Sequence, residues 1–404
     1  MRQIHDTMVA MKVRSIALLL LAELAAMSLW FVSAAILPEM VRDTTISATR
    51  QAALSSGVQG GFVVGALLSA WLGLADRFNP RLLFAICAIG AGLANALLVV
   101  APPGGAVSIA ARFVTGALLA GVYPVGMKIA VGWGQKDRGF LVGLLIGALT
   151  LGSAAPHVIA LAGGANWRAT VLCASAAALL AGIVILGTRL GPYHAKSQAF
   201  DPRVIGTAWR NRRVRLAYAG YLGHMWELYA MWAWIAAATA ASYAVSMPVA
   251  DAERMAKLTA FAAIAAGGLA SIVAGFVGDR IGKAETAAIA MAVSGTSAVC
   301  VAITFGGAPW LTFALVLLWG ASIVPDSGQF SALVADASPP HQTGSLMTFQ
   351  TALGFALTYA TVQVTPGLAM AWGWPAVIAI LALGPAAGIV AMLRLRSLQR
   401  AAAK

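Results

Sequence analysis

A short phrase occurs twice in this chain of 404 residues, each time inside an apolar stretch. Residues 23–30 read Glu-Leu-Ala-Ala-Met-Ser-Leu-Trp, and residues 227–234 read Glu-Leu-Tyr-Ala-Met-Trp-Ala-Trp, with five of the eight positions identical. A second pair of dipeptides, Asp76-Arg77 and Asp279-Arg280, repeats at nearly the same spacing. The chain is therefore expected to consist of two copies of one half.

The composition indicates that both halves lie in a membrane. Hydrophobic residues make up 60% of the chain and charged residues 10%, with a mean hydropathy of +0.83, whereas about a quarter of a soluble domain is charged. An apolar helix of about 20 residues spans a bilayer. Twelve such runs predict an all-α membrane protein with six helices in each half, at about residues 15–37, 52–75, 82–102, 106–128, 140–161, 168–188, 216–240, 257–278, 284–305, 309–332, 345–365 and 374–393.

The longest connection between two apolar runs divides the chain. We expect an N-terminal half at residues 1–188, a C-terminal half at residues 216–404 and a basic linker at residues 189–215 between them. Arginines are frequent in this linker, and a basic segment beside a membrane-spanning helix is typical of a cytoplasmic surface rich in anionic lipid. The sequence thus predicts a cytoplasmic linker that lies against the bilayer.

The net charge of +13 would suit nucleic-acid binding if the basic residues formed one patch. With the N-terminus inside, however, twenty of the 27 Lys and Arg residues fall in inner segments and only five in outer ones. This distribution follows the positive-inside rule. We therefore expect a multi-pass protein of the inner membrane with both termini cytoplasmic and no nucleic-acid partner, and we expect the first apolar run to be retained because it carries a copy of the repeat.

A few ionisable residues lie too deep in the predicted helices to reach an interface by extending their side chains. Such a residue costs roughly 2.5 kcal/mol or more in hydrocarbon and so indicates a functional site. We expect the repeated acids Glu23 and Glu227 to carry protons. We expect Arg112 and His224 to pair with a solute or a carboxylate, and Asp326 to make a contact on the cytoplasmic side. These candidate proton- and solute-binding residues are Glu23, Arg112, His224, Glu227 and Asp326.

His224 and Glu227 are three residues apart, so both side chains lie on one face of a helix. A carboxyl group buried beside an imidazole is a candidate proton acceptor near neutral pH, although a hydrogen-bonded structural pair with bulky packing also fits this pattern. Pro124 and Pro325 should break two helices at matching places, as is typical of cavity-lining helices. The expected cavity-lining side chains, several of which can stack on a planar or cationic solute, are Trp30, Tyr123, Tyr221, Trp226, Tyr229 and Gln329.

The two six-helix halves, the basic central loop and the turn at residues 275–283 together resemble the major facilitator superfamily over essentially the whole chain. The family's Gly-x-Leu-Ala-Asp-Arg-x-Gly-Arg-Lys motif is matched at residues 72–81, with Leu72 and Asn79 in place of its glycines, and asparagine tolerates a left-handed conformation. The resemblance implies cytoplasmic charge contacts that stabilise an outward-facing state. The residues concerned are Asp76, Arg77, Arg81, Asp279, Arg280 and Lys283.

Other segments place the chain within that superfamily. Residues 112–116 resemble the family's Arg-x-x-Gln-Gly motif, with Thr115 in the glutamine position, and the fifth helix lacks the Gly-Pro-x-x-Gly-Gly signature of antiporters. Residues 29–38 and 121–124 look most like the branch of cyanate and nitrate permeases. The predicted helices contain three deep acidic residues but only one deep arginine, so a cationic or neutral solute fits these residues better than an anion.

The sequence therefore predicts a secondary transporter that moves a small solute by alternating access, coupled to protons and more in keeping with symport than with export. No ATP-binding motif, metal cluster or catalytic constellation is recognisable, so we expect no cofactor, no ATP and no enzymatic activity. A proton-coupled exporter of organic cations or drugs is the main alternative. A membrane sensor built on a transporter fold is a more distant one.

Overall fold

The computed structural model describes residues 2–134, 137–163, 166–194, 204–339 and 342–402, and every regular element in these ranges is a helix. The first half contains α1 (Arg2–Met27), α2 (Val32–Asp43), α3 (Ala48–Leu72), α4 (Leu74–Arg77), α5 (Pro80–Ala96), α6 (Ala106–Leu119), α7 (Tyr123–Val131), α8 (Arg138–Ala162) and α9 (Trp167–Val184). The second contains α10 (Val204–Arg210), α11 (Arg212–Tyr243), α12 (Val249–Ile281), α13 (Lys283–Ile303), α14 (Pro309–Ile323), α15 (Ser327–Ala337), α16 (Thr343–Leu381) and α17 (Leu383–Ala402).

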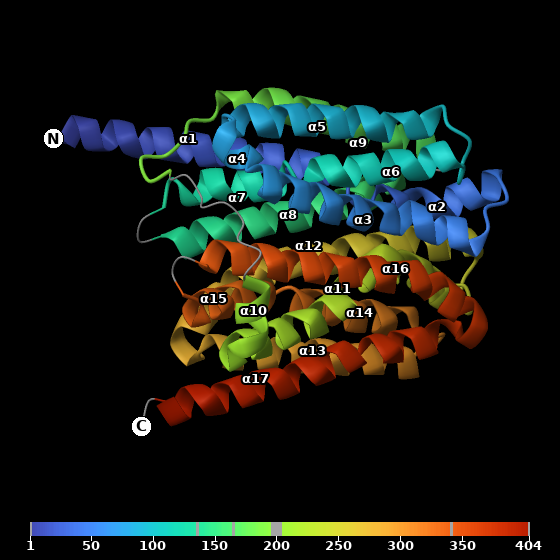
Figure 1. Cartoon of the computed structure of the whole chain (residues 1–404). Helices are drawn as coiled ribbons and strands as arrows, with labels where there is room; N and C mark the ends of the chain where they lie inside the picture. Colours follow the sequence, from blue (N-terminus) through green and yellow to red (C-terminus); the bar gives the residue numbers. More distant parts are fainter. Residues whose placement is uncertain (1, 135–136, 164–165, 195–203, 340–341, 403–404) are drawn as a thin grey trace.

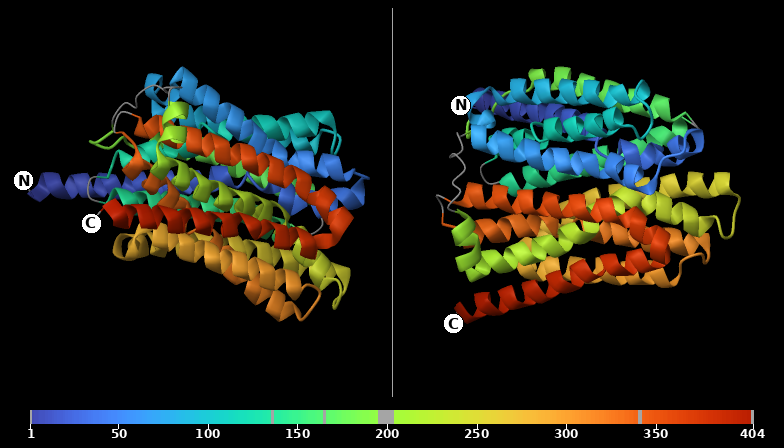
Figure 2. Two further views of the ribbon diagram at one scale, coloured as in Figure 1. Left: turned by 60° about the horizontal axis from the view of Figure 1, so that its bottom comes forward. Right: turned by 45° about the vertical axis from the view of Figure 1, so that its right-hand side comes forward.

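The helices form two bundles that lie side by side with their long axes roughly aligned (Figures 1 and 2). Helices α1–α9 make one bundle and α11–α17 the other, and the bundles contact each other through the pairs α3–α16 and α8–α12. Both chain ends lie at the same end of the molecule, which we call the terminal end (Figure 1). The opposite end is called the distal end.

Ten stretches of the described chain are long and apolar enough to cross a membrane. The last of them, Thr343–Ala401, contains the non-helical Gly373 at φ 81°, where the chain reverses direction and so crosses twice. Helix α11 is 32 residues long but is less apolar, because it begins with three arginines and contains Glu227. Splitting the last stretch and adding α11 gives the twelve crossing helices that the sequence predicts.

Three of the crossing helices are broken. The predicted breaks occur before Pro124, between α6 and α7, and beside Pro325, between α14 and α15. A third break separates α1 from α2 at residues 28–31, where the sequence predicts one continuous helix. The corresponding helix of the second half, α11, is continuous, so the two copies differ at this point.

Helices α3 and α6 approach so closely that glycine is required between them. A Cβ atom on Gly61 would lie 1.9 Å from the Phe113 carbonyl oxygen, and one on Gly116 would lie 2.0 Å from the Val58 carbonyl oxygen. We expect Gly61→Ala to push the helices apart and to lower the free energy of unfolding by about 1–3 kcal/mol. Thermal unfolding in detergent measures this, with Gly143→Ala as the control, since its Cβ would have no heavy atom within 4 Å. Equal midpoints for the two variants would contradict this packing.

Candidate functional site

The break in the first crossing helix is held by Arg112 of α6, a fully buried side chain. Its Nη1 donates to the Leu29 carbonyl oxygen at 2.9 Å and to Asn95 Oδ1 at 2.8 Å, and its Nη2 donates to the Trp30 carbonyl oxygen at 2.7 Å. Carbonyl groups at a helix break need such donors, because hydrocarbon offers none. Arg112 thus stabilises the break and fixes the backbone that carries the Trp30 side chain.

The sequence predicts that Arg112 pairs with a solute or a carboxylate, but in the structure it binds two backbone carbonyls and an amide oxygen. Helix α11 of the second half has no break, and this difference agrees with a role of Arg112 in stabilising the break between α1 and α2. At the offset of 201–204 residues that relates the halves, residues 313–316 stand opposite Arg112, and all four are apolar. The second half has no arginine there to satisfy a broken helix.

Glu23 lies on α1 with no exposed surface, and neither of its carboxyl oxygens has a hydrogen-bond partner among the described residues. Its Oε2 occupies space left by Gly126 of α7, where an added Cβ would lie 2.7 Å away. The same Cβ would be 3.5 Å from Leu19 and from Phe84, which are both apolar. Glu23 is therefore an isolated carboxyl group beside the break of the fourth crossing helix.

Glu227 occupies the same place in the repeat but has a different environment. It is 1% exposed, and its two oxygens accept hydrogen bonds from Trp319 Nε1 at 2.7 Å and from Ser294 Oγ at 3.0 Å. These donors belong to α14 and α13 of the same bundle. The two repeated acids thus differ in hydrogen bonding although both are buried.

His224 lies one helical turn before Glu227 and contacts the break between α14 and α15. Its Nδ1 is 2.8 Å from Asp326 Oδ1, and its Nε2 is 2.8 Å from Ser327 Oγ. Asp326, expected to make a contact on the cytoplasmic side, is 1% exposed and pairs with this histidine of its own half. Three of the predicted site residues therefore lie together in the second bundle, while Glu23 and Arg112 lie in the first.

The predicted cavity-lining residues separate into two groups. Trp226 Nε1 donates to the Ile380 carbonyl oxygen at 3.1 Å, and Gln329 Nε2 donates to the Ala274 carbonyl oxygen at 3.2 Å, so both side chains join helices within the second bundle. Tyr221 lies beside His224, with ring centroids 6.2 Å apart, and Tyr123 is half-buried at the start of α7. The remaining two, from the repeated phrase region, lie where the bundles meet.

That meeting place is a group of six buried rings, which we call the central aromatic cluster. The first bundle contributes Trp30, Phe31 and Phe62, and the second contributes Tyr229, Trp232 and Phe355. Contacts across the boundary include Phe62–Phe355, at a centroid distance of 4.5 Å, and Trp30–Tyr229, at 5.8 Å. Two of the six rings, Trp30 and Tyr229, are among the cavity-lining residues predicted from the sequence, and Trp232 stands inside the repeated phrase.

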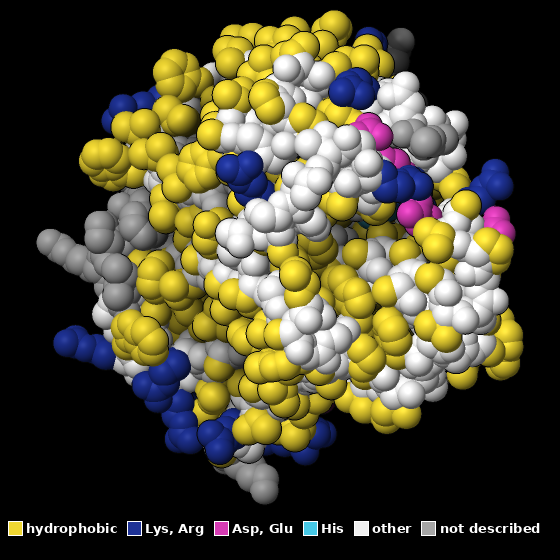
Figure 3. Space-filling model, turned by 90° about the vertical axis from the view of Figure 1, so that its right-hand side faces the viewer, with side chains coloured by type: hydrophobic (Ala, Val, Ile, Leu, Met, Phe, Trp, Pro, Cys, Tyr) yellow, Lys and Arg dark blue, Asp and Glu magenta, His cyan; other side chains and the backbone are white. Residues whose placement is uncertain are grey.

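Buried charges also join the two bundles, at the distal end. Glu39 of α2 forms an ion pair with Lys257 of α12, and both side chains are less than a tenth exposed. Arg42 lies 3.1 Å from Glu253 and 3.8 Å from Glu39. Viewed from this end, the few acidic side chains gather on one side next to basic ones (Figure 3). These four residues, the distal ion-pair cluster, hold the bundles together at that end.

Removing Lys257 should release this contact. In Lys257→Met, Glu39 would remain buried with only Arg42, 3.8 Å away, near its carboxylate. Breaking a buried ion pair typically costs about 3–5 kcal/mol, so we expect the bundles to separate at the distal end. Distances between spin labels on α2 and α12 measure the opening. Lys12→Met is the matched control, because Lys12 pairs with Asp137 inside the first bundle at 2.5 Å. Adding Glu39→Gln to Lys257→Met should restore the closed distance, and an unchanged distance in Lys257→Met would contradict the proposed contact.

The two motif loops lie at the terminal end, where their described contacts remain within one half. Arg81 Nη1 donates to the Thr188 carbonyl oxygen at 2.8 Å, Lys283 pairs with Asp336, and Arg77 and Arg280 are exposed. The side chains of Asp76 and Asp279 lie outside the described residues.

Asn79 does not adopt the left-handed conformation that asparagine tolerates. Asn79 has φ −62° and caps α5 by accepting a hydrogen bond from the Arg81 backbone N–H at 3.1 Å. The left-handed residue is Gly73, at φ 62°, which ends α3 six residues earlier. Pro80 follows Asn79 directly and favours an extended backbone at that position.

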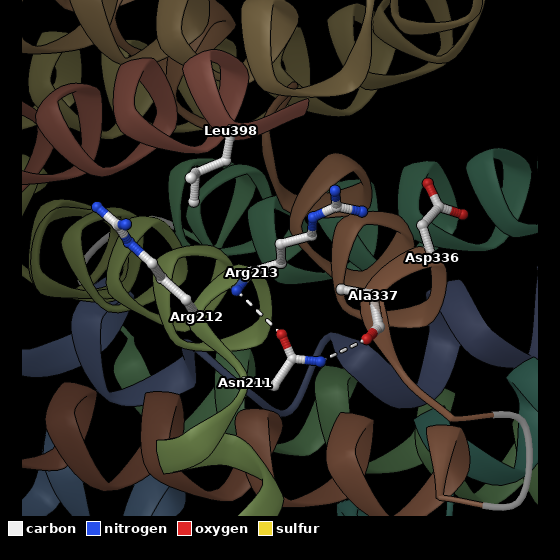
Figure 4. A pocket seen from close by; sticks show the side chains of 6 residues that line it. All are labelled: Asn211, Arg212, Arg213, Asp336, Ala337 and Leu398. Atoms are coloured by element: carbon white, nitrogen blue, oxygen red, sulfur yellow. Dashed lines mark hydrogen bonds between the residues drawn. The ribbon is translucent and has the colours of Figure 1, made fainter. Parts of the chain in front are cut away.

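Two hollows lie outside this central region. One encloses about 420 Å³ at the terminal end and is lined by Asn211, Arg212, Arg213, Asp336, Ala337 and Leu398. Asn211 bridges its walls by accepting from the Arg213 N–H and donating to the Ala337 carbonyl oxygen, while the side chains of Arg212 and Arg213 point in different directions (Figure 4). The other, of about 350 Å³, is a largely apolar groove between α3, α6 and α16.

Two helix bundles with buried ionisable groups in each and a shared aromatic boundary define a membrane transporter. The sequence profile of the Major Facilitator Superfamily matches residues 18–362, and the chain belongs to that superfamily. It is therefore a secondary transporter and not an enzyme, as the sequence predicts.

Solved structures show the same fold at low sequence identity. The nucleoside transporter NupG is similar with a TM-score of 0.71 and 12% identity, over 95% of this chain and 99% of that one. A D-xylose-proton symporter is similar with a TM-score of 0.71 and 12% identity, over 92% of this chain and 96% of that one. No curated protein matches this sequence significantly.

Proposed function

We propose that this transporter couples the movement of a small solute to protons and takes up both together. The observation that carries the proposal is Glu23, which is fully buried without a hydrogen-bond partner among the described residues. An ionised carboxylate in such surroundings is far more costly than a neutral carboxyl group. Enclosing Glu23 between α1 and α7 is therefore linked to the binding of a proton.

Glu227, the second repeated acid, lies in an environment that favours its charged form more than that of Glu23 does. Two donors, from Trp319 and Ser294, already face the oxygens of Glu227, and hydrogen bonds to a carboxylate stabilise its charged form. One repeated position thus favours the proton-bound acid and the other offers donors to the charged acid. A difference of this kind supports movement of a proton during the transport cycle.

The contacts between the bundles support alternating access. The distal ion-pair cluster and the central aromatic cluster close the boundary at the distal end and in the middle. We propose that residues 1–188 and 216–404 rock about this boundary, with residues 189–215 as the connection. The state that opens the distal end requires the pairs of Lys257 and Arg42 to break.

The charge distribution supports an inner-membrane location with the terminal end in the cytoplasm. Basic side chains lie at that end on several elements and include Arg81, Arg212, Arg213, Lys283, Arg396 and Arg400. Cytoplasmic segments of membrane proteins carry such an excess of Lys and Arg.

Export of organic cations or drugs by exchange with protons is the second candidate. The buried acids could balance a positive charge, and the aromatic faces of the central cluster attract cations. One of the structural neighbours is a proton symporter by its name, which favours uptake without identifying the solute of this chain.

The lumenal pH of proteoliposomes distinguishes these functions. The vesicles start without a gradient, and a panel of anionic, neutral and cationic solutes is added outside. Solute-dependent acidification indicates symport, and alkalinisation indicates antiport. A complete lack of proton movement with any transported solute would overturn the coupling, and Glu285→Gln, which changes an acid that pairs with Arg396 at the terminal end, serves as the control variant.

A further inference from the structure

Two buried indole N–H groups lack acceptors. Trp30 is 2% exposed and Trp232 is 1% exposed, and neither Nε1 has a hydrogen-bond partner among the described residues. Buried donors in native proteins are nearly always paired, and the exceptions call for an explanation. These two are members of the central aromatic cluster.

The other tryptophans show that an unpaired indole is exceptional here. Five of them donate to a carbonyl or a carboxylate oxygen at 2.7–3.1 Å, namely Trp133, Trp167, Trp226, Trp234 and Trp319. Three of these acceptors are backbone carbonyls, and two of the three lie on α16. Among the buried indoles of the described residues, only Trp30 and Trp232, where the bundles meet, lack a partner.

The two unpaired indoles come from opposite bundles and share one neighbouring ring. Trp30 and Trp232 both contact the ring of Tyr229, with centroid distances of 5.8 Å and 5.6 Å. Trp30 lies at the helix break that Arg112 holds, so its position is fixed by a second element. Trp232 lies on the continuous helix α11. A solute between the bundles would meet one donor from each side.

We propose, building on the proposed transport of a solute through this boundary, that the central aromatic cluster binds a planar solute through hydrogen-bond acceptors. The rings provide flat apolar faces on which an aromatic or heteroaromatic body can stack. The Nε1 groups of Trp30 and Trp232 donate to its carbonyl or carboxylate oxygens. A solute whose polar group only donates leaves both indoles unpaired, and a site built to hydrogen-bond its ligand discriminates strongly against such an analogue.

The cluster argues against the cationic solute that the buried acids would accept. Its six members carry no charged group, and Tyr229 is the one member with a hydroxyl oxygen. An organic amine would find ring faces but almost no acceptor. A neutral or anionic planar molecule would satisfy both donors when the bundles close around it.

Matched benzene derivatives test this assignment. Benzoate and methyl benzoate offer oxygen acceptors, whereas benzylammonium offers donors on a ring of the same size. The indole ¹⁵N–¹H resonances of the protein in lipid nanodiscs are recorded with each probe, and those of Trp30 and Trp232 are assigned by their loss in Trp30→Phe and Trp232→Phe. We expect both resonances to move downfield with the two acceptor probes and to stay in place with benzylammonium.

Binding affinity gives the second readout. Either Phe variant should weaken the binding of the acceptor probes by about tenfold or more, equivalent to about 1.4 kcal/mol, while Trp71→Phe, at an indole that is 76% exposed, should leave it unchanged. Stronger binding of benzylammonium, or no shift of either resonance with any probe, would overturn the assignment of the solute class.

The outcome is independent of proton coupling. Solute-driven proton movement that persists in both Phe variants, together with unmoved indole resonances, would refute this binding mode and leave the proposed function intact. Shifted resonances without any proton movement would establish the site and refute the coupling.

Discussion

Arg112→Ala is expected to unfold at a much lower temperature than the unchanged protein and to lose solute transport. The substitution removes three hydrogen bonds, to the carbonyl oxygens of Leu29 and Trp30 and to the amide oxygen of Asn95. Each buried acceptor left without a partner costs about 1–3 kcal/mol, so the total loss should exceed about 3 kcal/mol. Thermal unfolding in detergent and solute counterflow measure the two effects.

A lysine at this position separates charge from geometry. Arg112→Lys keeps a positive charge, but a single ammonium group cannot reproduce the planar fork that reaches two successive carbonyls and Asn95. We expect it to recover only part of the stability. Arg394→Ala is the control, because Arg394 is an exposed arginine of α17. A fully stable Arg112→Ala with normal counterflow would show that the first helix holds its break without this side chain.

Replacing either repeated acid with glutamine is expected to uncouple solute movement from protons. Glutamine resembles a protonated glutamate in shape but cannot release a proton, so Glu23→Gln should be held in the proton-bound form. Glu227→Gln keeps a carbonyl oxygen that can accept from Trp319 or Ser294, so the second bundle should keep its packing. Both variants should therefore fold while losing net proton transport.

The helices and the duplication could be predicted because hydrophobicity and spacing are local properties. The twelve crossing helices follow from runs of apolar residues, and the paired breaks follow from Pro124 and Pro325. The boundaries are less certain where charge enters a helix. Helix α12 begins at Val249, eight residues before the predicted run, because its first turns carry Asp251, Glu253 and Arg254 and are not apolar.

The break at residues 28–31 could not be predicted, because it contains neither proline nor glycine. It is stabilised by Arg112, which lies about eighty positions further along the chain. The contacts of the candidate site could not be predicted either. The repeat identified Glu23 and Glu227 as a pair, but their different environments depend on Gly126 and Phe84 in one bundle and on Ser294 and Trp319 in the other. Such contacts between distant helices leave no spacing signal.

The contacts between the bundles were missed for a related reason. In the sequence, Lys257 and Arg42 are recognisable only as basic residues of the outer segments. Glu39, the partner of Lys257, lies just beyond an apolar run, next to Pro38. The ion pairs Glu39–Lys257 and Arg42–Glu253 join α2 to α12, which are about two hundred residues apart in the sequence. The rings of Phe62 and Phe355 likewise give no sign in the sequence that they meet.

Coupling of solute movement to protons by the buried acids is tested by comparing counterflow with uphill accumulation in Glu23→Gln proteoliposomes. Counterflow needs no proton gradient, whereas accumulation driven by an inward proton gradient needs a proton on the transporter. We expect Glu23→Gln to retain solute counterflow and to lose at least about tenfold in gradient-driven accumulation, a change worth about 1.4 kcal/mol, with Glu285→Gln unchanged in both assays. Accumulation at the unchanged protein's level in Glu23→Gln would contradict this coupling.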